Sequence, residues 1–230
     1  MMHPSVDCVN CKCKPSCFSY LSETDYNHLN ESKRSLDFKK GETIIKQGTF
    51  ASHIIYIREG LVKESTFNHA KENVISIDSS GAFIGLDSLF SNNTFPYSII
   101  AYKNTSVCMF ETEIIRELVR KNGLFAEQIL IKLNERNQKI YSRFSCLTQK
   151  NALSRVVELL LFLSQEIYNS GTFLSDLSKK NICEFTQISA ESLSRILKDL
   201  MTQQLLDIDK KTYTINNASE LIKYAAQKNK

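Results

Sequence analysis

The fold is decided by one stretch near the C-terminus, Gln187-Ile188-Ser189-Ala190-Glu191-Ser192-Leu193-Ser194-Arg195-Ile196-Leu197-Lys198-Asp199-Leu200. Its apolar residues recur at the i, i+3, i+4, i+7 spacing of a helix that buries one stripe: Leu193, Ile196, Leu197 and Leu200. The opposite face carries Glu191, Ser194, Arg195 and Lys198. Ser189 stands at the N-cap position, where its hydroxyl can accept a backbone N–H. The stretch therefore predicts a short helix whose polar face can reach base edges in a major groove.

The flanking segments distinguish this helix from an ordinary surface helix, which would show the same pattern by itself. Upstream, residues 178–185 predict a shorter helix capped by Ser178, and residues 186–188 form a tight connection. Two short helices joined by a turn are typical of a helix-turn-helix. Downstream, residues 206–209 and 212–215 alternate like two strands around Lys210-Lys211, which adds a basic β-wing.

The set Glu191, Ser194 and Arg195 resembles the Glu-x-x-Ser-Arg reading set in the recognition helix of the Crp/Fnr family of bacterial transcription regulators. The resemblance implies a homodimeric regulator that binds palindromic double-stranded DNA and works with RNA polymerase, not an enzyme. It implies a winged helix-turn-helix domain, which we place at residues 151–230. The chemistry of the side chains predicts that Arg195 binds guanine and Glu191 accepts from cytosine. The residues expected to contact DNA are Glu191, Ser194, Arg195, Lys198, Lys179, Lys180, Lys210 and Lys211.

Composition permits this function without identifying it. The 230 residues, 42% hydrophobic and 23% charged, can form a substantial core, and we expect two domains. The net charge is only +4, and from residue 151 onward 10 Lys and Arg face 9 Asp and Glu, so DNA affinity must come from locally placed cations. No apolar run reaches the roughly 20 residues that span a bilayer, and the N-terminus lacks a signal-peptide pattern. We therefore expect a soluble, cytoplasmic protein with no membrane partner.

Residues 36–110 show the period-two pattern of β-strands. Short runs predict strands at 54–57, 61–62, 74–77, 98–101 and 107–110. Turn-like positions between the runs hold Gly41, Gly48, Gly60, Gly81 and Gly85. Many short strands with glycine turns predict a small antiparallel barrel or jelly roll. The span resembles the β-roll sensory domain of the same family, so the expected fold class is α+β, with a cyclic-nucleotide-binding-like β-roll at residues 21–120.

Cyclic-nucleotide binding is not expected of this β-roll. Family members that bind these ligands use a Gly-Glu-Leu segment for the ribose and, about ten residues later, Arg-Ser for the cyclic phosphate. The corresponding segments here are Gly85-Leu86-Asp87-Ser88 and Phe95-Pro96-Tyr97-Ser98. A phosphate buried without a guanidinium partner is strongly destabilised.

A long helix is expected at residues 121–150. Its apolar seam consists of Ile129, Leu133, Ile140, Phe144 and Leu147, and the neighbouring positions are mostly cationic. A helix packed on its own domain can show such a seam, but a narrow stripe favours a dimer interface. The resemblance likewise implies a dimerisation helix, and we expect the hinge to the next domain between Cys146 and Asn151.

Four of the seven cysteines crowd into residues 8–17, which indicates metal or redox chemistry in a reducing compartment. The polar segment 1–20 has too little apolar surface to fold alone. A zinc site could use Cys8, Cys11, Cys13 and Cys17, although the one-residue gap is tight and Cys108 is then unused. A reversible disulfide switch is the other alternative. We expect Cys146 and Cys183 to be buried structural thiols.

Without Cys13, the spacing Cys-x2-Cys-x5-Cys resembles that of the oxygen-sensing branch of the family, the fumarate and nitrate reduction regulators. The resemblance implies a [4Fe–4S] cluster whose ligands are Cys8, Cys11, Cys17 and Cys108, the last in a Val-Cys strand before the helical region. Cys13 departs from the pattern as a competing ligand or a resolving thiol. A redox enzyme would use the same cysteines, but no Ser/His/Asp set, phosphate loop or paired carboxylate supports catalysis.

Overall fold

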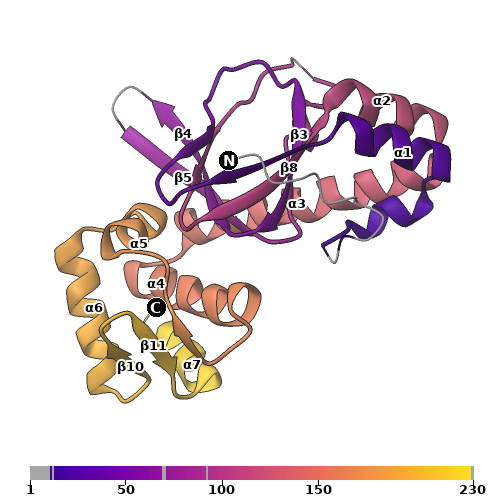
Figure 1. The fold of residues 1–230 in the computed structure, drawn as a ribbon. Helices are drawn as coiled ribbons and strands as arrows, with labels where there is room; N and C mark the ends of the chain where they lie inside the picture. Colours follow the sequence, from indigo (N-terminus) through magenta and orange to yellow (C-terminus); the bar gives the residue numbers. More distant parts are fainter. Residues whose placement is uncertain (1–10, 12, 69–70, 92, 229–230) are drawn as a thin grey trace. The chain divides into compact units, whose positions relative to one another are not determined.

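A computed structural model describes residue 11 and residues 13–68, 71–91 and 93–228. The chain forms two compact units, with the division between Ile140 and Tyr141. Figure 1 follows the chain through both. No helix in the described ranges is long and apolar enough to cross a membrane.

The first unit contains two four-stranded antiparallel sheets, in the orders β1-β8-β3-β6 and β2-β7-β4-β5. The strands are β1 (Arg34–Phe38), β2 (Thr43–Ile45), β3 (His53–Glu59), β4 (Leu61–Asn68), β5 (Lys71–Ser79), β6 (Phe83–Ile84), β7 (Ser98–Ala101) and β8 (Thr105–Glu111). Each of the five strands predicted from the period-two pattern is confirmed within these bounds. The pairing of non-neighbouring strands produces the expected β-roll.

The strands β3 and β8 have apolar side chains on both faces, because the sheet lies between two cores. Ile55, Ile57 and Val107 belong to the interior core that the two sheets enclose. Ile54 and Phe110 alternate with them and belong to a second core on the other face. Figure 1 shows the helices of this unit on the side of β3 and β8.

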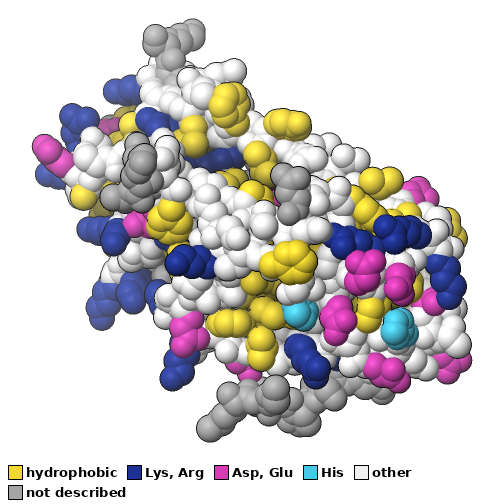
Figure 2. Space-filling model, turned by 90° about the horizontal axis from the view of Figure 1, so that it is seen from above, with side chains coloured by type: hydrophobic (Ala, Val, Ile, Leu, Met, Phe, Trp, Pro, Cys, Tyr) yellow, Lys and Arg dark blue, Asp and Glu magenta, His cyan; other side chains and the backbone are white. Residues whose placement is uncertain are grey.

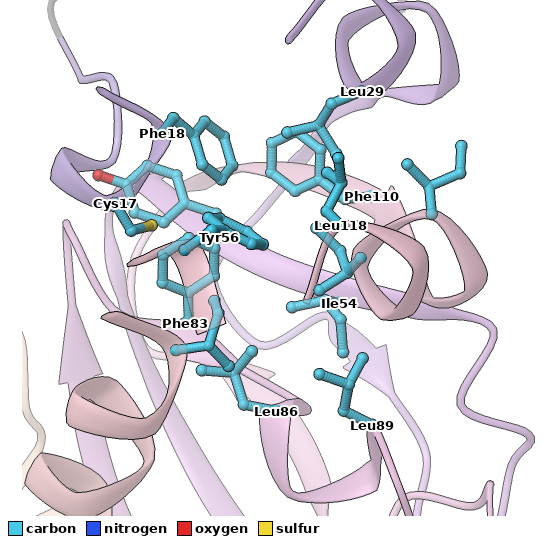
Figure 3. Packing of buried hydrophobic residues seen from close by; sticks show 14 of the residues in the cluster. Cys17, Phe18, Leu29, Ile54, Tyr56, Phe83, Leu86, Leu89, Phe110 and Leu118 are labelled. Carbon is cyan, nitrogen blue, oxygen red and sulfur yellow. The ribbon is translucent and has the colours of Figure 1, made fainter. Parts of the chain in front are cut away.

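That second core is covered by helical segments from before and after the roll. They are η2 (Ser16–Tyr20), α1 (Glu23–Ser32), α2 (Thr112–Lys121) and the start of α3 (Gly123–Gln149), with the short turn η3 (Leu86–Ser88) beside them. The N-cap of α1 is Ser22, whose hydroxyl accepts from Asp25 N. Figure 3 shows the packed side chains of this core.

A glycine allows the close turn between β3 and β4. Gly60 has φ +132°, and a Cβ atom there would lie 2.3 Å from the Thr105 hydroxyl oxygen. Any side chain at Gly60 would therefore clash with Thr105, and the positive φ would also strain the backbone.

The second unit combines helices with a three-stranded antiparallel sheet of order β10-β11-β9. After the end of α3 its elements are α4 (Ala152–Phe162), the π-helical turn η4 (Leu163–Ile167), β9 (Thr172–Leu174), α5 (Lys179–Thr186), α6 (Ala190–Thr202), β10 (Leu206–Asp209), β11 (Thr212–Ile215) and α7 (Ala218–Gln227). Both predicted wing strands have the predicted bounds. The fold is a cyclic-nucleotide-binding-type β-sandwich followed by helices and a winged helix-turn-helix, as predicted.

Exposed large apolar side chains occur on both units, among them Phe50, Phe90, Tyr141 and Phe144. Figure 2 shows one face of the molecule, on which hydrophobic side chains stand among charged ones. Such isolated side chains are common on protein surfaces and do not by themselves mark a binding site.

Candidate functional site

The helix α6 presents a polar face because its apolar stripe is fully used by the core. Leu193 and Leu200 have 0% exposure, and Ile196 and Leu197 are also buried. The N-cap is Ser189, whose hydroxyl accepts from Ser192 N at 3.1 Å. The predicted cap and buried stripe of this helix are confirmed.

The turn before α6 is held by local hydrogen bonds. Ser178 and Asn181 form a capping box at the start of α5. Gln187 ends α5 in the left-handed conformation, with φ 52°. The Thr186 hydroxyl is buried and donates to Ile182 O at 2.7 Å. These contacts fix the angle between α5 and α6 within the second unit.

Four residues predicted to contact bases or phosphates lie on the exposed face of α6: Glu191, Ser194, Arg195 and Lys198. Ser194 donates its hydroxyl to Ala190 O at 2.8 Å, so the oxygen faces outward mainly as an acceptor. Within the described part of the chain, no ion pair engages Arg195 or Lys198. Their cationic groups are therefore available to DNA.

The remaining predicted cations flank α6. Lys210 and Lys211 are exposed at the tip of the β10–β11 hairpin, and Lys210 has φ 54°. Lys179 and Lys180 are exposed at the start of α5, where Lys180 lies 3.8 Å from Glu184. An exposed ion pair of this kind is weak, so it does not prevent Lys180 from contacting a phosphate.

Arg143 is a positioning residue that sequence analysis missed. Its guanidinium donates to Phe185 O and lies 3.8 Å above the Phe185 ring, which joins the end of α3 to α5. Burial lowers the pKa of this guanidinium. The only signal in the sequence was one more cation in a cationic helix, which does not distinguish a buried partner from a solvated one.

The thiols of the first unit gather on the face of the sheet that carries the second core. Cys17 of η2 is 1% exposed and Cys108 of β8 is 5% exposed, and both belong to that core. They are 91 residues apart in the sequence. Cys108 stands opposite Tyr56 in the β3–β8 pairing and 3.8 Å from the Ser35 hydroxyl.

Tyr56 belongs to the same core as Cys17 and Cys108. Its pKa is raised to about 12 by burial and by the charges of Cys13, Cys17, Cys11 and Cys108. Figure 3 shows Cys17 and Tyr56 at the same end of the core, next to Phe83. The ring of Tyr56 lies 4.8 Å from that of Phe83. The electrostatic influence of all four thiols therefore extends to this one aromatic side chain.

The thiols converge without forming a complete ligand set. Cys8 lies outside the described residues, and no group of three described His, Cys, Asp or Glu residues is arranged to hold a metal ion. Cys13 is exposed, whereas burial raises the pKa of Cys17 to about 11. Of the two thiols assigned to structural roles, Cys146 is buried as expected and Cys183 is only half-buried.

Two residues of the predicted dimer seam face their own domain. Ile129 is 3% exposed within the second core, and Leu133 packs against the same core. The prediction of Ile129 as an interface residue was wrong, because the first half of α3 uses its apolar stripe to cover β3 and β8. Leu133 is half-buried, and its place in the interface stays a prediction. Of the other three, Phe144 is 66% exposed, whereas Ile140 and Leu147 are half-buried.

Comparisons with known proteins agree with this division of the chain. The family model of the cyclic nucleotide-binding domain matches residues 35–122, and that of the Crp-like helix-turn-helix domain matches residues 154–224. The chain belongs to the Crp/Fnr family of bacterial transcription regulators.

Individual relatives of the Crp/Fnr family match nearly the whole chain. The anaerobic regulatory protein of Aggregatibacter actinomycetemcomitans is 24% identical over 98% of this chain and 91% of the relative. The fumarate and nitrate reduction regulatory protein of Vibrio cholerae is 23% identical over 96% of this chain and 91% of the relative. The solved structure of FixK2 from Bradyrhizobium japonicum has a TM-score of 0.76 at 18% identity, covering 82% of this chain and 95% of that one. The protein is thus a DNA-binding regulator and not an enzyme.

The two segments of this chain that correspond to the cyclic-nucleotide-binding segments of the family carry different side chains. Leu86 is 2% exposed, in the place where nucleotide binders of the family use a carboxylate. Tyr97 is 2% exposed and donates its hydroxyl to Asp87 Oδ1 at 2.9 Å. The place expected for a phosphate therefore holds a buried tyrosine that is hydrogen-bonded to a carboxylate.

Proposed function

We propose that this protein is a homodimeric regulator of transcription whose DNA binding is controlled by an oxygen- or redox-labile [4Fe–4S] cluster. The observation that carries the sensory part is the packing of Cys17 and Cys108, which are far apart in the sequence, into one core beside Tyr56. Relatives named as anaerobic or fumarate and nitrate reduction regulators support the same signal class. RNA polymerase is the proposed protein partner at promoters.

DNA recognition is assigned to α6 and its flanking cations. Arg195 is proposed to bind guanine O6 and N7 in a bidentate contact, and Glu191 to accept from a cytosine amino group. Lys179, Lys210 and Lys211 are proposed to contact phosphates, which supply affinity but little sequence discrimination.

The dimer interface is assigned to the exposed apolar stripe of α3. Leu130, Tyr141 and Phe144 are 59%, 71% and 66% exposed. Their spacings of eleven and three residues place them on one face of a continuous helix. Two such helices packed about a two-fold axis bury this stripe, and the resulting dimer fits a palindrome whose half-sites lie about 34 Å apart.

The thiol group has the chemistry that an iron–sulfur cluster requires. Its proposed ligands are Cys8, Cys11, Cys17 and Cys108, and cysteine thiolates are the usual ligands of such clusters. A buried thiolate such as that of Cys17 is costly without a cation beside it, as its raised pKa indicates. When bound, the cluster would supply an oxygen-sensitive centre that ties η2 to β8.

A chain of contacts leads from the thiols to α3 within the first unit. Phe18, next to Cys17, packs 6.3 Å from the Phe125 ring of α3. The Asn122 side chain donates to Tyr20 O at 2.8 Å and accepts from Phe125 N at 3.0 Å. Asn122 thus both caps α3 and holds the N-terminal segment, so a change in that segment is transmitted to the proposed dimer helix.

Protein purified without air tests the proposal through two substitutions of cysteine. Cys108→Ser is expected to abolish the brown chromophore near about 400 nm and the oxygen-responsive DNA binding together, because it removes a ligand. Cys13→Ser is the matched control and is expected to spare both. Absorption spectra, iron content and DNA retardation with and without air provide the measurements.

The opposite pattern identifies a different sensor. If Cys13→Ser removes the metal and Cys108→Ser leaves it, the ligand set is the N-terminal one and the protein holds zinc. If neither metal nor chromophore is present and oxidation alone changes DNA binding, the exposed Cys13 supports a thiol switch.

A further inference from the structure

An arginine of α3 reaches into the interior of the β-roll. Arg136 Nη1 lies 2.7 Å from Glu64 Oε2, and Nη2 lies 3.5 Å from Asp87 Oδ2. The guanidinium carbon lies 4.8 Å from the centre of the Tyr97 ring. Only 11% of the Arg136 side chain is exposed, so nearly all its contacts are with the roll.

Two of the groups that receive Arg136, Glu64 and Tyr97, are buried, whereas the side chain of Asp87 is 33% exposed. Glu64 is 0% exposed and stands opposite Ile99 in the β4–β7 pairing, on the face that the two sheets enclose. Asp78 of β5 is also buried and interacts electrostatically with Glu64. Tyr97 donates to Asp87 and accepts from Gly85 N at 3.3 Å. Carboxylates and an aromatic face form a complete receptor for one guanidinium.

The receptor occupies the part of the roll where related proteins bind a small molecule. Tyr97 and Asp87 lie in the two segments that nucleotide binders of the family use for phosphate and ribose. A neighbouring cleft, which is lined by residues 78–83 and by residues of α3 that include Arg136, has a volume of about 240 Å³. Pockets for small organic ligands usually measure about 300–1,000 Å³. Arg136 therefore fills space that an effector would otherwise need.

We propose that Arg136 is the built-in ligand of the β-roll: its guanidinium takes the place of a diffusible effector and docks α3 onto the sensory domain permanently. The roll is thereby always in the liganded arrangement, and small-molecule binding is not the signal. This assignment does not depend on the thiol group or on DNA binding.

Chemical rescue of the full-length chain tests the assignment. Arg136→Ala is expected to lower the melting temperature of the first unit by roughly 10 °C, because it leaves buried carboxylates without a partner. Millimolar methylguanidinium is expected to restore much of that loss in Arg136→Ala and to leave the wild-type chain unchanged. Methylammonium at the same concentration controls for ionic strength and for a point charge.

Two further variants make the result decisive. Lys139→Ala removes an exposed cation from the same helix and is expected to melt like the wild type without response to methylguanidinium. Glu64→Gln combined with Arg136→Ala is expected to lose the rescue, because an amide replaces the carboxyl group that accepts from the guanidinium. An Arg136→Ala chain that melts like the wild type, or a rescue that survives Glu64→Gln, overturns the proposal.

If Arg136→Ala does not fold, Arg136→Lys decides the question. A lysine keeps the charge but lacks the planar fork and stacks less well on Tyr97. A clear loss of melting temperature in Arg136→Lys, absent when Glu64 is already Gln, supports the assignment, whereas equal stability of Arg136→Lys and wild type contradicts it.

Discussion

At the scale of single residues, exposed and buried charges have different roles in this protein. Arg195 stands on the free face of α6 with no described ion pair, so its charge is available to a partner. Arg136 has the same chemistry but is almost completely enclosed by Glu64, Asp87 and Tyr97. Environment, and not residue type, therefore separates a recognition residue from a structural one.

The first residue-scale prediction concerns Arg195. Arg195→Ala is expected to weaken binding of the specific site by about 1–3 kcal/mol per half-site and to relax the preference at one base pair. Lys211→Ala is the matched control, since a phosphate contact weakens all sequences alike and lowers the salt dependence. Retardation assays on specific and random DNA measure both. Equal losses on the two DNAs for Arg195→Ala would show that α6 does not read bases through this residue.

The second residue-scale prediction concerns Glu64. Burial and the charge of Asp78 raise the pKa of this carboxyl to about 8, although Arg136 acts in the opposite direction. The buried Oε1 atom has no hydrogen-bond partner among the described residues, whereas Oε2 accepts from Arg136. The pKa of this acid is 4.5 in the unfolded chain and higher in the folded chain, so its protonation stabilises the fold fully below pH 4.5. This contribution to stability is lost as the pH rises toward 8.

Thermal unfolding at several pH values measures this linkage. The melting temperature of the wild-type first unit is expected to fall between pH 5 and pH 8 relative to that of Glu64→Gln, which cannot ionise. Parallel pH profiles for the two proteins would mean that Glu64 is ionised throughout this range.

At the scale of elements, α3 changes its function along its length. Its first half buries Phe125 and Ile129 in the second core of the sensory domain. Farther along, Tyr141 and Phe144 are exposed, and Arg143 contacts α5. A single continuous helix therefore has an apolar face that is buried in the sensory domain, an apolar face that is exposed, and a cationic side chain that contacts α5.

The element-scale prediction concerns the stripe of α3. Phe144→Glu would place two carboxylates opposite each other across a two-fold axis, where burying unpaired charges costs several kcal/mol. We expect a monomer in sedimentation that no longer binds a palindrome. Ser142→Glu, which adds the same charge on another exposed face, is expected to remain dimeric. A dimeric Phe144→Glu with normal binding would place the interface on a different surface.

At the scale of the whole molecule, the sensory contacts must reach the dimer helix if thiol chemistry is to control DNA binding. Asn122 is the proposed connection, because its side chain donates to Tyr20 O and accepts from Phe125 N in the first turn of α3. Removal of the Asn122 side chain should therefore make DNA binding less responsive to the thiol group, while the thiol group and the DNA-binding domain stay intact.

Asn122→Ala tests the connection in the full chain. Loss of a helix cap costs about 1 kcal/mol, and the variant is expected to keep its chromophore while its DNA binding responds less to air. Ser22→Ala removes a comparable cap from α1 and is expected to retain the full response. Spectra and retardation assays on the same samples provide the comparison. An undiminished oxygen response in Asn122→Ala would require another path to α3.

The sequence by itself determined the order of elements and the helix-turn-helix. Ser178 and Ser189 each accept a hydrogen bond from the backbone N–H three residues later, and the stripe from Leu193 to Leu200 has the helical period, so local spacing is sufficient to predict both features. The wing strands and the β-roll strands follow from period-two alternation and glycine turns in the same way. The exposed set on α6 could be predicted because the buried stripe of a helix defines its opposite face.

Only the tertiary structure decided which side chains far apart in the sequence meet. Cys17 and Cys108 share a core because η2 packs on β8, and no local pattern records that packing. Ile129 was predicted to contact a partner chain, because an apolar stripe has the same pattern whether its own domain or a second chain covers it. Arg136 and Arg143 looked like solvated cations, since a charge in the sequence is the same whether it is buried against Glu64 or exposed to water. Helical and strand periods repeat over a few residues, whereas these contacts depend on how distant elements pack.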